Sequence, residues 1–310
     1  MYQHKCYKIA LNAHMTCPNR DGTLDTRGCI FCSAGGSGDF AVDCTGKSIT
    51  EQLAEGMQLF HNKKVGKHFI AYFQAFTNTY APISYLEQVY RPALEHPDVC
   101  GISIATRPDC IPDEVVNLLV ALKREFPEKF IWIELGLQTI HKDTAEFIRR
   151  GYPLSCFEDA VARLKKAEIP VIVHVILGLP HETREMMLAT VEYLNRLHPF
   201  GVKLQLLHVL KHTDLATSYE NLEFETLTKP VYLKLVMDCL TALSPDIVVH
   251  RVTGDGPKEI LIAPKWSCNK RDVLNSLHKM MKDEDAWQGR DYSCYTPSPH
   301  NILPQDAPAP

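Results

Sequence analysis

The chain has 310 residues, of which 45% are hydrophobic and 23% charged, a composition typical of a globular protein with an apolar core. No run of 18 or more apolar residues occurs, and the N-terminal segment lacks the features of a secretory signal. We therefore expect a cytoplasmic protein without a membrane-spanning helix. The formal net charge of −4 argues against a strongly basic surface of the kind that coats nucleic acid.

Short β-branched runs alternate with amphipathic stretches as far as residue 210. The predicted strands are Tyr7–Leu11, His68–Phe73, Gly101–Thr106, Phe130–Leu137, Val171–Leu177 and Val202–Leu210. The predicted helices between them are Ile49–His61, Pro112–Glu125, Phe157–Ala167 and Glu182–Leu197. After the first unit the strands start roughly every 30 to 40 residues, the length of a βαβ unit. They are apolar at successive positions, as are parallel strands that helices cover on both faces.

Six βα units predict an α/β fold with a partial (β/α)6 barrel of the TIM type, open rather than closed. After residue 211 the predicted elements are a helix at Lys229–Leu243, strands at Ile247–Arg251 and Ile260–Ile262, and a helix at Lys270–Lys282. We expect a barrel domain at 1–215, an α+β extension closing the barrel at 216–290, and a proline-rich, extended or disordered tail at 291–310. Ligands of such a sheet bind beyond the carboxyl ends of its strands.

Three of the eleven cysteines are grouped on the loop after the first predicted strand. Cys17 and Cys29 are separated by eleven residues, and Cys29 and Cys32 by two. A Cys-x2-Cys pair is common in zinc sites, but neither His14 nor Cys44 supplies a second pair of ligands at the usual spacing. Three thiolates can hold a [4Fe–4S] cluster and leave one iron open to a ligand.

The segment CPNRDGTLDTRGCIFC, residues 17–32, resembles the radical S-adenosylmethionine (SAM) superfamily and within it the YhcC-type branch. That branch is similar to the elongator catalytic subunit and to oxygen-independent coproporphyrinogen oxidase. The resemblance implies that Cys17, Cys29 and Cys32 bind a [4Fe–4S] cluster, that SAM chelates its open iron, and that SAM cleavage yields a 5′-deoxyadenosyl radical. It implies a flavodoxin- or ferredoxin-type electron donor as a partner. A zinc-binding scaffold protein is the non-enzymatic alternative.

The resemblance also implies where SAM lies. After the second strand, relatives often carry Gly-Gly-Glu for the SAM ammonium, whereas this sequence offers Gln74, which we prefer, and Thr77. In the fourth strand, Glu134 is expected to accept hydrogen bonds from the ribose, because a carboxylate in an apolar strand needs a partner. Gln138 follows toward the open edge.

Arg150 is expected to pair with the SAM carboxylate, for which its planar guanidinium is suited, although a cation at a helix end is the alternative. The segment HVILGLP resembles the part of related enzymes that packs against adenine, which implicates Gly178 and Leu179. His174 lies where coproporphyrinogen-oxidase-like relatives carry an acid, and a core histidine is the alternative.

Candidate substrate-binding residues near the same edge are Arg107, Asp109, Lys203, Lys211, Arg251 and Lys270; a structural Arg–Asp turn is the alternative for the first two. The resemblance implies tRNA as the substrate, with a carboxymethylaminomethyl group at the 5-position of the wobble uridine converted to aminomethyl. A small molecule such as a tetrapyrrole is the alternative, which the acidic net charge favours.

Overall fold

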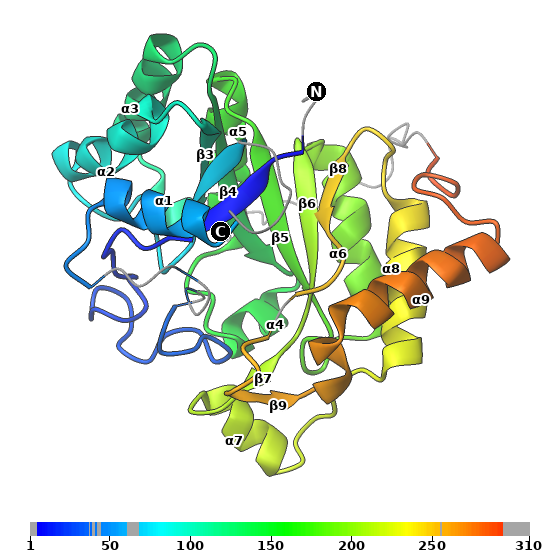
Figure 1. Ribbon diagram of the computed structural model, residues 1–310. Coiled ribbons are helices and arrows are strands. Elements are labelled where there is room, and N and C mark those ends of the chain that lie inside the picture. The colour runs from blue at the N-terminus through cyan, green and yellow to red at the C-terminus, as the bar shows by residue number, and fades with distance from the viewer. Residues whose placement is uncertain are drawn as a thin grey trace, which may run out of the picture.

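In the computed structural model, the described residues are 5–36, 38, 41, 45–60, 68–254 and 256–293. Seven strands form one sheet in which neighbouring strands are parallel, in the order β1-β2-β3-β4-β5-β6-β8. The strands are β1 (Tyr7–Leu11), β2 (Phe69–Phe73), β3 (Val99–Thr106), β4 (Phe130–Gln138), β5 (Val171–Leu177), β6 (Gly201–Leu206) and β8 (Val248–Arg251). The sheet curls into an open half-barrel (Figure 1), which confirms the predicted partial TIM-like fold.

Helices pack around the outside of the sheet, as expected for parallel strands joined by crossovers (Figure 1). They are α1 (Ile49–Gln58), α2 (Ile83–Glu95), α3 (Asp113–Glu125), α4 (Lys142–Phe147), α5 (Leu154–Lys166), α6 (Arg184–Leu197), α7 (Asp214–Glu220), α8 (Lys229–Ala242) and α9 (Lys270–Asp283). Strands β7 (Val209–Leu210) and β9 (Leu261–Ala263) form a separate antiparallel pair. Within the part of the chain that the structure describes, no helix has the length and apolarity to cross a bilayer.

Local sequence sets where the helices begin. Ser48 and Glu51 form a capping box at the start of α1, in which each side chain accepts a hydrogen bond from the other residue's backbone N–H. Thr183 caps α6 by accepting from the backbone N–H of Met186, so this helix begins at Arg184 and not at the predicted Glu182. The main core lies between these helices and the apolar outer face of the sheet.

Several elements differ from the prediction. Helices α2 and α7 were not predicted: α2 contains Pro92, which normally interrupts a helix, and α7 is short. Strand β8 was assigned to the C-terminal extension, but it pairs with β6 and adds a seventh parallel strand to the barrel sheet. The predicted domain limits remain a prediction, and Cys44 and residues 294–310 of the tail lie outside the described residues.

Side chains on the inner face of the sheet lie in layers, as in TIM barrels. At the amino ends of the strands an apolar cluster fills the barrel, formed by Ile70, Trp132 and Ile172 with Cys6, Phe130 and Phe200. Two residues further along, the strands carry a polar layer consisting of Lys8, Tyr72, Ser103, Glu134, His174 and Lys203. The next layer contains Ala10, Gln74, Ala105, Gly136, Ile176 and Gln205. Because three of these last residues are Ala or Gly, the barrel is hollow at this level.

Candidate active site

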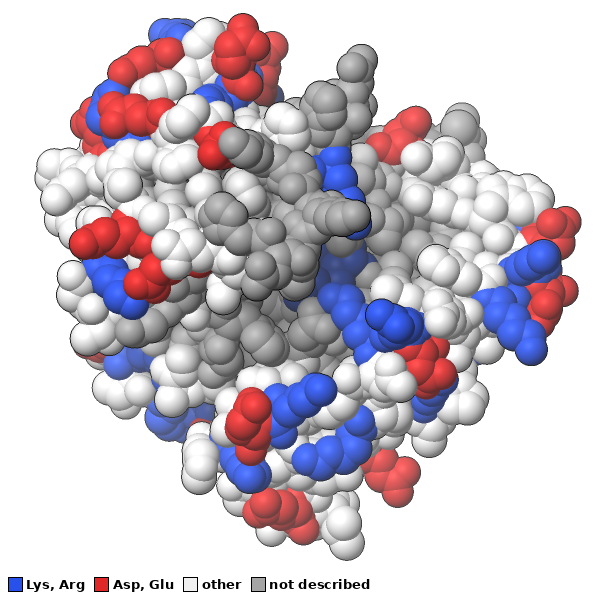
Figure 2. Space-filling view, viewed as in Figure 1, with Lys and Arg blue, Asp and Glu red and all other residues white. Residues whose placement is uncertain are grey.

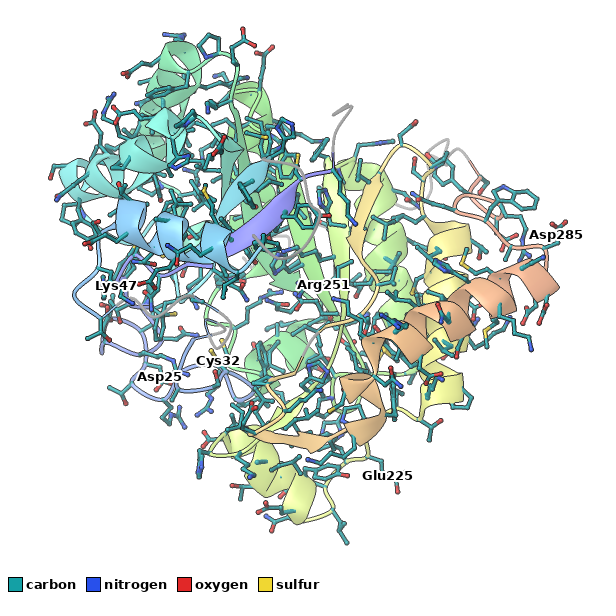
Figure 3. The ribbon with its side chains drawn as sticks, in the orientation of Figure 1. Asp25, Cys32, Lys47, Glu225, Arg251 and Asp285 are labelled. Carbon is teal, nitrogen blue, oxygen red and sulfur yellow. The ribbon has the colours of Figure 1, made fainter. Side chains whose placement is uncertain are left out.

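The hollow part of the barrel is a cavity of about 950 Å³. Its walls come from the inner faces of the strands and from the cysteine loop, residues 12–36, which follows β1. Lys and Arg side chains gather along a recess at the centre of the face shown in Figure 2. In Figure 3, Cys32 lies on the cysteine loop and Arg251 lies near the centre of the view. The site therefore lies where the parallel-strand fold predicts it.

The cysteine loop is held by its own hydrogen bonds. Arg20 donates to the carbonyl oxygens of Cys32 and Ser33 at 2.9 and 2.6 Å, which joins the two ends of the loop. Gly28 has a φ of +79°, and its N–H donates to the carbonyl of Asn19 at 2.7 Å. A Cβ at Gly28 would lie 2.9 Å from the Arg20 side chain, so glycine is required both for the conformation and for the space.

Cys17, Cys29 and Cys32 all line the cavity as free thiols. Burial raises the pKa of Cys29 to about 12, and the nearby Cys32 and Cys17 thiols contribute to this rise. Among the described residues, no three Cys, His, Asp or Glu side chains are grouped tightly enough for one metal ion. A single zinc holds its thiolates at about 2.3 Å, whereas a [4Fe–4S] cluster binds each thiolate through a different iron. The three thiols line one cavity, and their binding of a cluster remains a prediction.

Glu134 is the centre of the polar layer. It is only 1% exposed, and its Oε1 accepts from Lys8 Nζ and from Ser103 Oγ, each at 2.6 Å. Its Oε2 lies 2.7 Å from His174 Nε2 and accepts from Lys203 Nζ. Donors from four other strands thus fill the four acceptor positions of one carboxylate.

The charges of these groups depend on one another. Burial alone raises the pKa of Glu134, but the charges of Lys203 and Lys8, together with His174, outweigh it and hold the pKa well below its usual value. Burial lowers the pKa of Lys203 to about 7, against the attraction of Glu134. Burial also lowers the pKa of His174 to about 4, so its imidazole is neutral near pH 7 and donates to Glu134. Gln205 lies 3.1 Å from the other ring nitrogen of His174.

The structure brings most of the predicted SAM-binding residues to the cavity. Those that line it are Gln74, Thr77, Glu134, Gln138, Arg150 and His174. Gln138 has a buried side-chain oxygen without a hydrogen-bond partner among the described residues, so this atom can accept from a ligand. All four acceptor positions of Glu134 are occupied by protein donors, so Glu134 can bind a ribose hydroxyl only if one of these donors moves away. Its role as a ribose ligand stays a prediction.

The cavity does not include Gly178 or Leu179 among its lining residues. A Cβ at Gly178 would lie 3.1 Å from Leu227, and Leu179 packs in an apolar cluster with Ile30 and Ile148. Both residues follow β5, where the chain turns away from the cavity wall. Their contact with adenine remains a prediction.

Arg150 and Arg107 are occupied by protein groups. Arg150 donates to the carbonyl oxygens of Leu137 and Thr139 through Nη1 and to that of Tyr152 through Nε. Arg107 forms two hydrogen bonds with Asp109, at 2.9 and 2.7 Å, and its Nη1 donates to the carbonyl of Arg150. These bonds support the Arg–Asp turn. The contact of Arg150 with the SAM carboxylate remains a prediction.

The other candidate substrate residues divide into two groups. Arg251 and Lys270 line the cavity. Lys211 is exposed, does not line the cavity, and donates to the carbonyl of Glu259. Lys203 is 3% exposed and paired with Glu134, so its ammonium does not reach the surface, and its contact with a substrate remains a prediction.

Sequence reasoning missed Lys8, Tyr72 and Ser103 of the polar layer, as well as Arg20. Lys8 is a charge inside a short apolar strand, the same signal that identified Glu134. The partnership of Lys8 with Glu134 joins residues 126 positions apart and depends on the curvature of the sheet. The sequence pattern therefore carried a signal for Lys8 but not for its partner.

Comparison with known proteins assigns the chain to a family. Residues 26–194 match the radical SAM superfamily, and residues 199–283 match the radical SAM C-terminal domain. The chain belongs to the radical SAM superfamily. This radical SAM protein is 45% identical to YtqA of Bacillus subtilis over 289 residues, covering 93% of this chain and 88% of YtqA. It is 33% identical to YhcC of Escherichia coli K12 over 282 residues, covering 91% and 89%.

The same fold occurs in a solved structure of Elp3 from the archaeon Methanocaldococcus infernus. The TM-score is 0.69 at 15% sequence identity, and the match covers 91% of this chain and 64% of the Elp3 chain. The radical SAM protein described here therefore shares the architecture of Elp3, and it is a radical SAM enzyme of the family that includes YtqA and YhcC.

Proposed function

We propose that this radical SAM enzyme binds a [4Fe–4S] cluster through Cys17, Cys29 and Cys32 and modifies the wobble uridine of tRNA. The observation that carries the proposal is that the three thiols open into the same cavity of about 950 Å³ as the polar layer. When bound, the cluster and SAM supply a 5′-deoxyadenosyl radical that abstracts a hydrogen atom from the substrate.

Protein groups around the cysteines can hold SAM. Gln74 and Thr77 follow β2, and their side chains provide acceptors for the SAM ammonium. Gln138 offers its unpartnered side-chain oxygen to a ribose hydroxyl or to the ammonium. Arg150 lines the same wall and provides positive charge near the SAM carboxylate.

Two observations support a tRNA substrate. The chain is 23% identical over 165 residues to the tRNA uridine(34) acetyltransferase of Methanocaldococcus jannaschii, covering 52% of this chain and 29% of that protein. The cavity walls also carry cationic side chains that suit the carboxylate of a carboxymethylaminomethyl group. Abstraction of hydrogen from the glycine-like CH₂ of this group would leave a carbon radical. Transfer of one electron from it back to the oxidised cluster, with loss of a proton, would give an imine, which water would hydrolyse to aminomethyluridine and glyoxylate.

A second candidate is a radical SAM reaction on a small carboxylated molecule such as a tetrapyrrole. The size of the cavity favours it, because about 950 Å³ is within the range of small-ligand sites. The formal net charge of −4 also favours a small ligand over a polyanion.

The experiment uses anaerobically reconstituted enzyme with SAM, a reductant and bulk tRNA from a strain that lacks the gene. We expect tRNA to increase 5′-deoxyadenosine formation and nucleoside mass spectrometry to show loss of carboxymethylaminomethyluridine. Wild-type tRNA, already modified, serves as the control and should have a smaller effect. Identical nucleosides in deletion and wild-type strains, with no effect of tRNA on 5′-deoxyadenosine, would exclude the tRNA substrate and leave the small-molecule candidate.

A further inference from the structure

The floor of the cavity, formed by the polar layer, adjoins an arginine from the last strand of the sheet. Arg251 ends β8 and is the register partner of Lys203 on β6. It lines the cavity together with Lys8, Tyr72 and Glu134. Arg251 also lies close enough to Lys203 for its charge to lower the Lys203 pKa, after the larger effect of burial.

Among the described residues that line the cavity, cationic side chains outnumber carboxylates. Among the described residues, six cationic side chains and one carboxylate, Glu134, line the cavity; the cations are Lys8, Arg20, Arg107, Arg150, Arg251 and Lys270. Glu134 is paired with Lys8 and Lys203, and Arg107 is paired with Asp109 outside the cavity. An uncompensated positive charge in a partly desolvated site attracts an anionic ligand.

Arg251 has no ion-pair partner in the described parts of the chain, although it is half-buried. The other cavity arginines differ from it, because Arg20 and Arg150 bind carbonyl oxygens and Arg107 binds Asp109. A partly buried guanidinium without a partner is unfavourable until a ligand supplies one. Its planar, two-pronged geometry matches a carboxylate or a phosphate.

We propose that Arg251, together with Lys8, binds an oxyanion of the substrate on the floor of the cavity. Lys8 Nζ lies 4.4 Å from the centre of the Tyr72 ring, which holds its ammonium at the cavity wall beside Glu134. This inference rests on the proposed function, in which the oxyanion is the carboxylate of the carboxymethylaminomethyl group. A phosphate has the same chemistry and is distinguished by the experiment.

The test measures binding by isothermal titration calorimetry to reconstituted enzyme with SAM. The probes are 5-carboxymethylaminomethyluridine, 5-aminomethyluridine and inorganic phosphate. The variant is Arg251→Gln, and the matched control is Arg271→Gln, which changes an exposed arginine on α9 outside the cavity. Arg251→Lys keeps the charge without the two-pronged geometry. Thermal unfolding of each variant confirms that it is folded.

We expect Arg251→Gln to bind the carboxylate nucleoside about ten- to a hundredfold more weakly than wild type and Arg271→Gln, with Arg251→Lys between them. The aminomethyl nucleoside should bind equally to all. If the carboxylate nucleoside does not bind the wild type, the wobble-uridine substrate is rejected and phosphate binding tests the oxyanion site. Phosphate that binds the wild type but not Arg251→Gln supports that site. Equal binding to Arg251→Gln and Arg271→Gln, or no binding of either anion, overturns the inference. SAM cleavage in the same preparations tests the proposed chemistry separately.

Discussion

Replacing Glu134 by Gln removes the charge on which the polar layer depends. A Gln amide keeps one acceptor oxygen but turns an NH₂ group toward two of the four donors that surround Glu134. Two lost charge-assisted hydrogen bonds cost about 3–6 kcal/mol, and breaking a buried ion pair costs about 3–5 kcal/mol. We therefore expect Glu134→Gln to lower the free energy of unfolding by about 3–5 kcal/mol at pH 6.

The decrease in unfolding free energy caused by Glu134→Gln should become smaller as the pH rises to 7. Burial lowers the pKa of Lys203 to about 7, and the charge of Glu134 opposes this lowering. In Glu134→Gln the Lys203 pKa falls further below 7. Between that lower pKa and pH 7, Lys203 loses its proton when the variant folds, whereas it keeps the proton when the wild type folds. For each pH unit below 7, the difference in unfolding free energy between the wild type and the variant grows by at most about 1.4 kcal/mol. This contribution is absent above pH 7.

The assay is urea unfolding of both proteins at pH 6, 7 and 8. The control is Glu192→Gln, which changes an exposed carboxylate on α6 and should alter stability by less than about 0.5 kcal/mol. A loss below about 1 kcal/mol for Glu134→Gln, or a loss that is the same at all three pH values, would refute the reasoning about the polar layer.

Three further substitutions test other parts of the site. Arg20→Gln should reduce iron retention in air, because the bonds to Cys32 and Ser33 that close the cysteine loop are lost; unchanged retention would contradict this role. Ala105→Leu should reduce 5′-deoxyadenosine yield on the order of a hundredfold by filling the cavity, while circular dichroism shows a folded protein. Arg150→Ala should lower the free energy of unfolding by roughly 2–4 kcal/mol, since three carbonyls lose their donor, and weaken SAM binding about tenfold or more. Wild-type SAM affinity in that variant would limit Arg150 to a structural role.

The sequence predicted the barrel well because buried parallel strands are apolar on both faces. Strands β1 and β5 begin and end at the predicted residues. Strand β8 was placed outside the barrel because β7, α7 and α8 separate it from β6 and hide the regular βα spacing. Helix α2 was missed because Pro92 lies inside it.

The site was predicted in part. Glu134 was recognised because a carboxylate in an apolar strand is costly, and the structure places it in the cavity wall. Its partners could not be predicted, because Lys8, His174 and Lys203 come together only through the stagger of neighbouring strands in the curled sheet. A pattern along the chain predicts which face a side chain lies on, but not which residue it meets on a distant strand.

The most direct test of the central claim measures iron, sulfide, zinc and SAM cleavage in anaerobically prepared wild type and in the Cys17→Ala, Cys29→Ala and Cys32→Ala variants. We expect about four iron and four sulfide per wild-type chain. We also expect 5′-deoxyadenosine from SAM and reductant, with loss of both cluster and product in each variant. About one zinc per chain without iron, or a variant that keeps a full cluster, would contradict the assignment of these three cysteines.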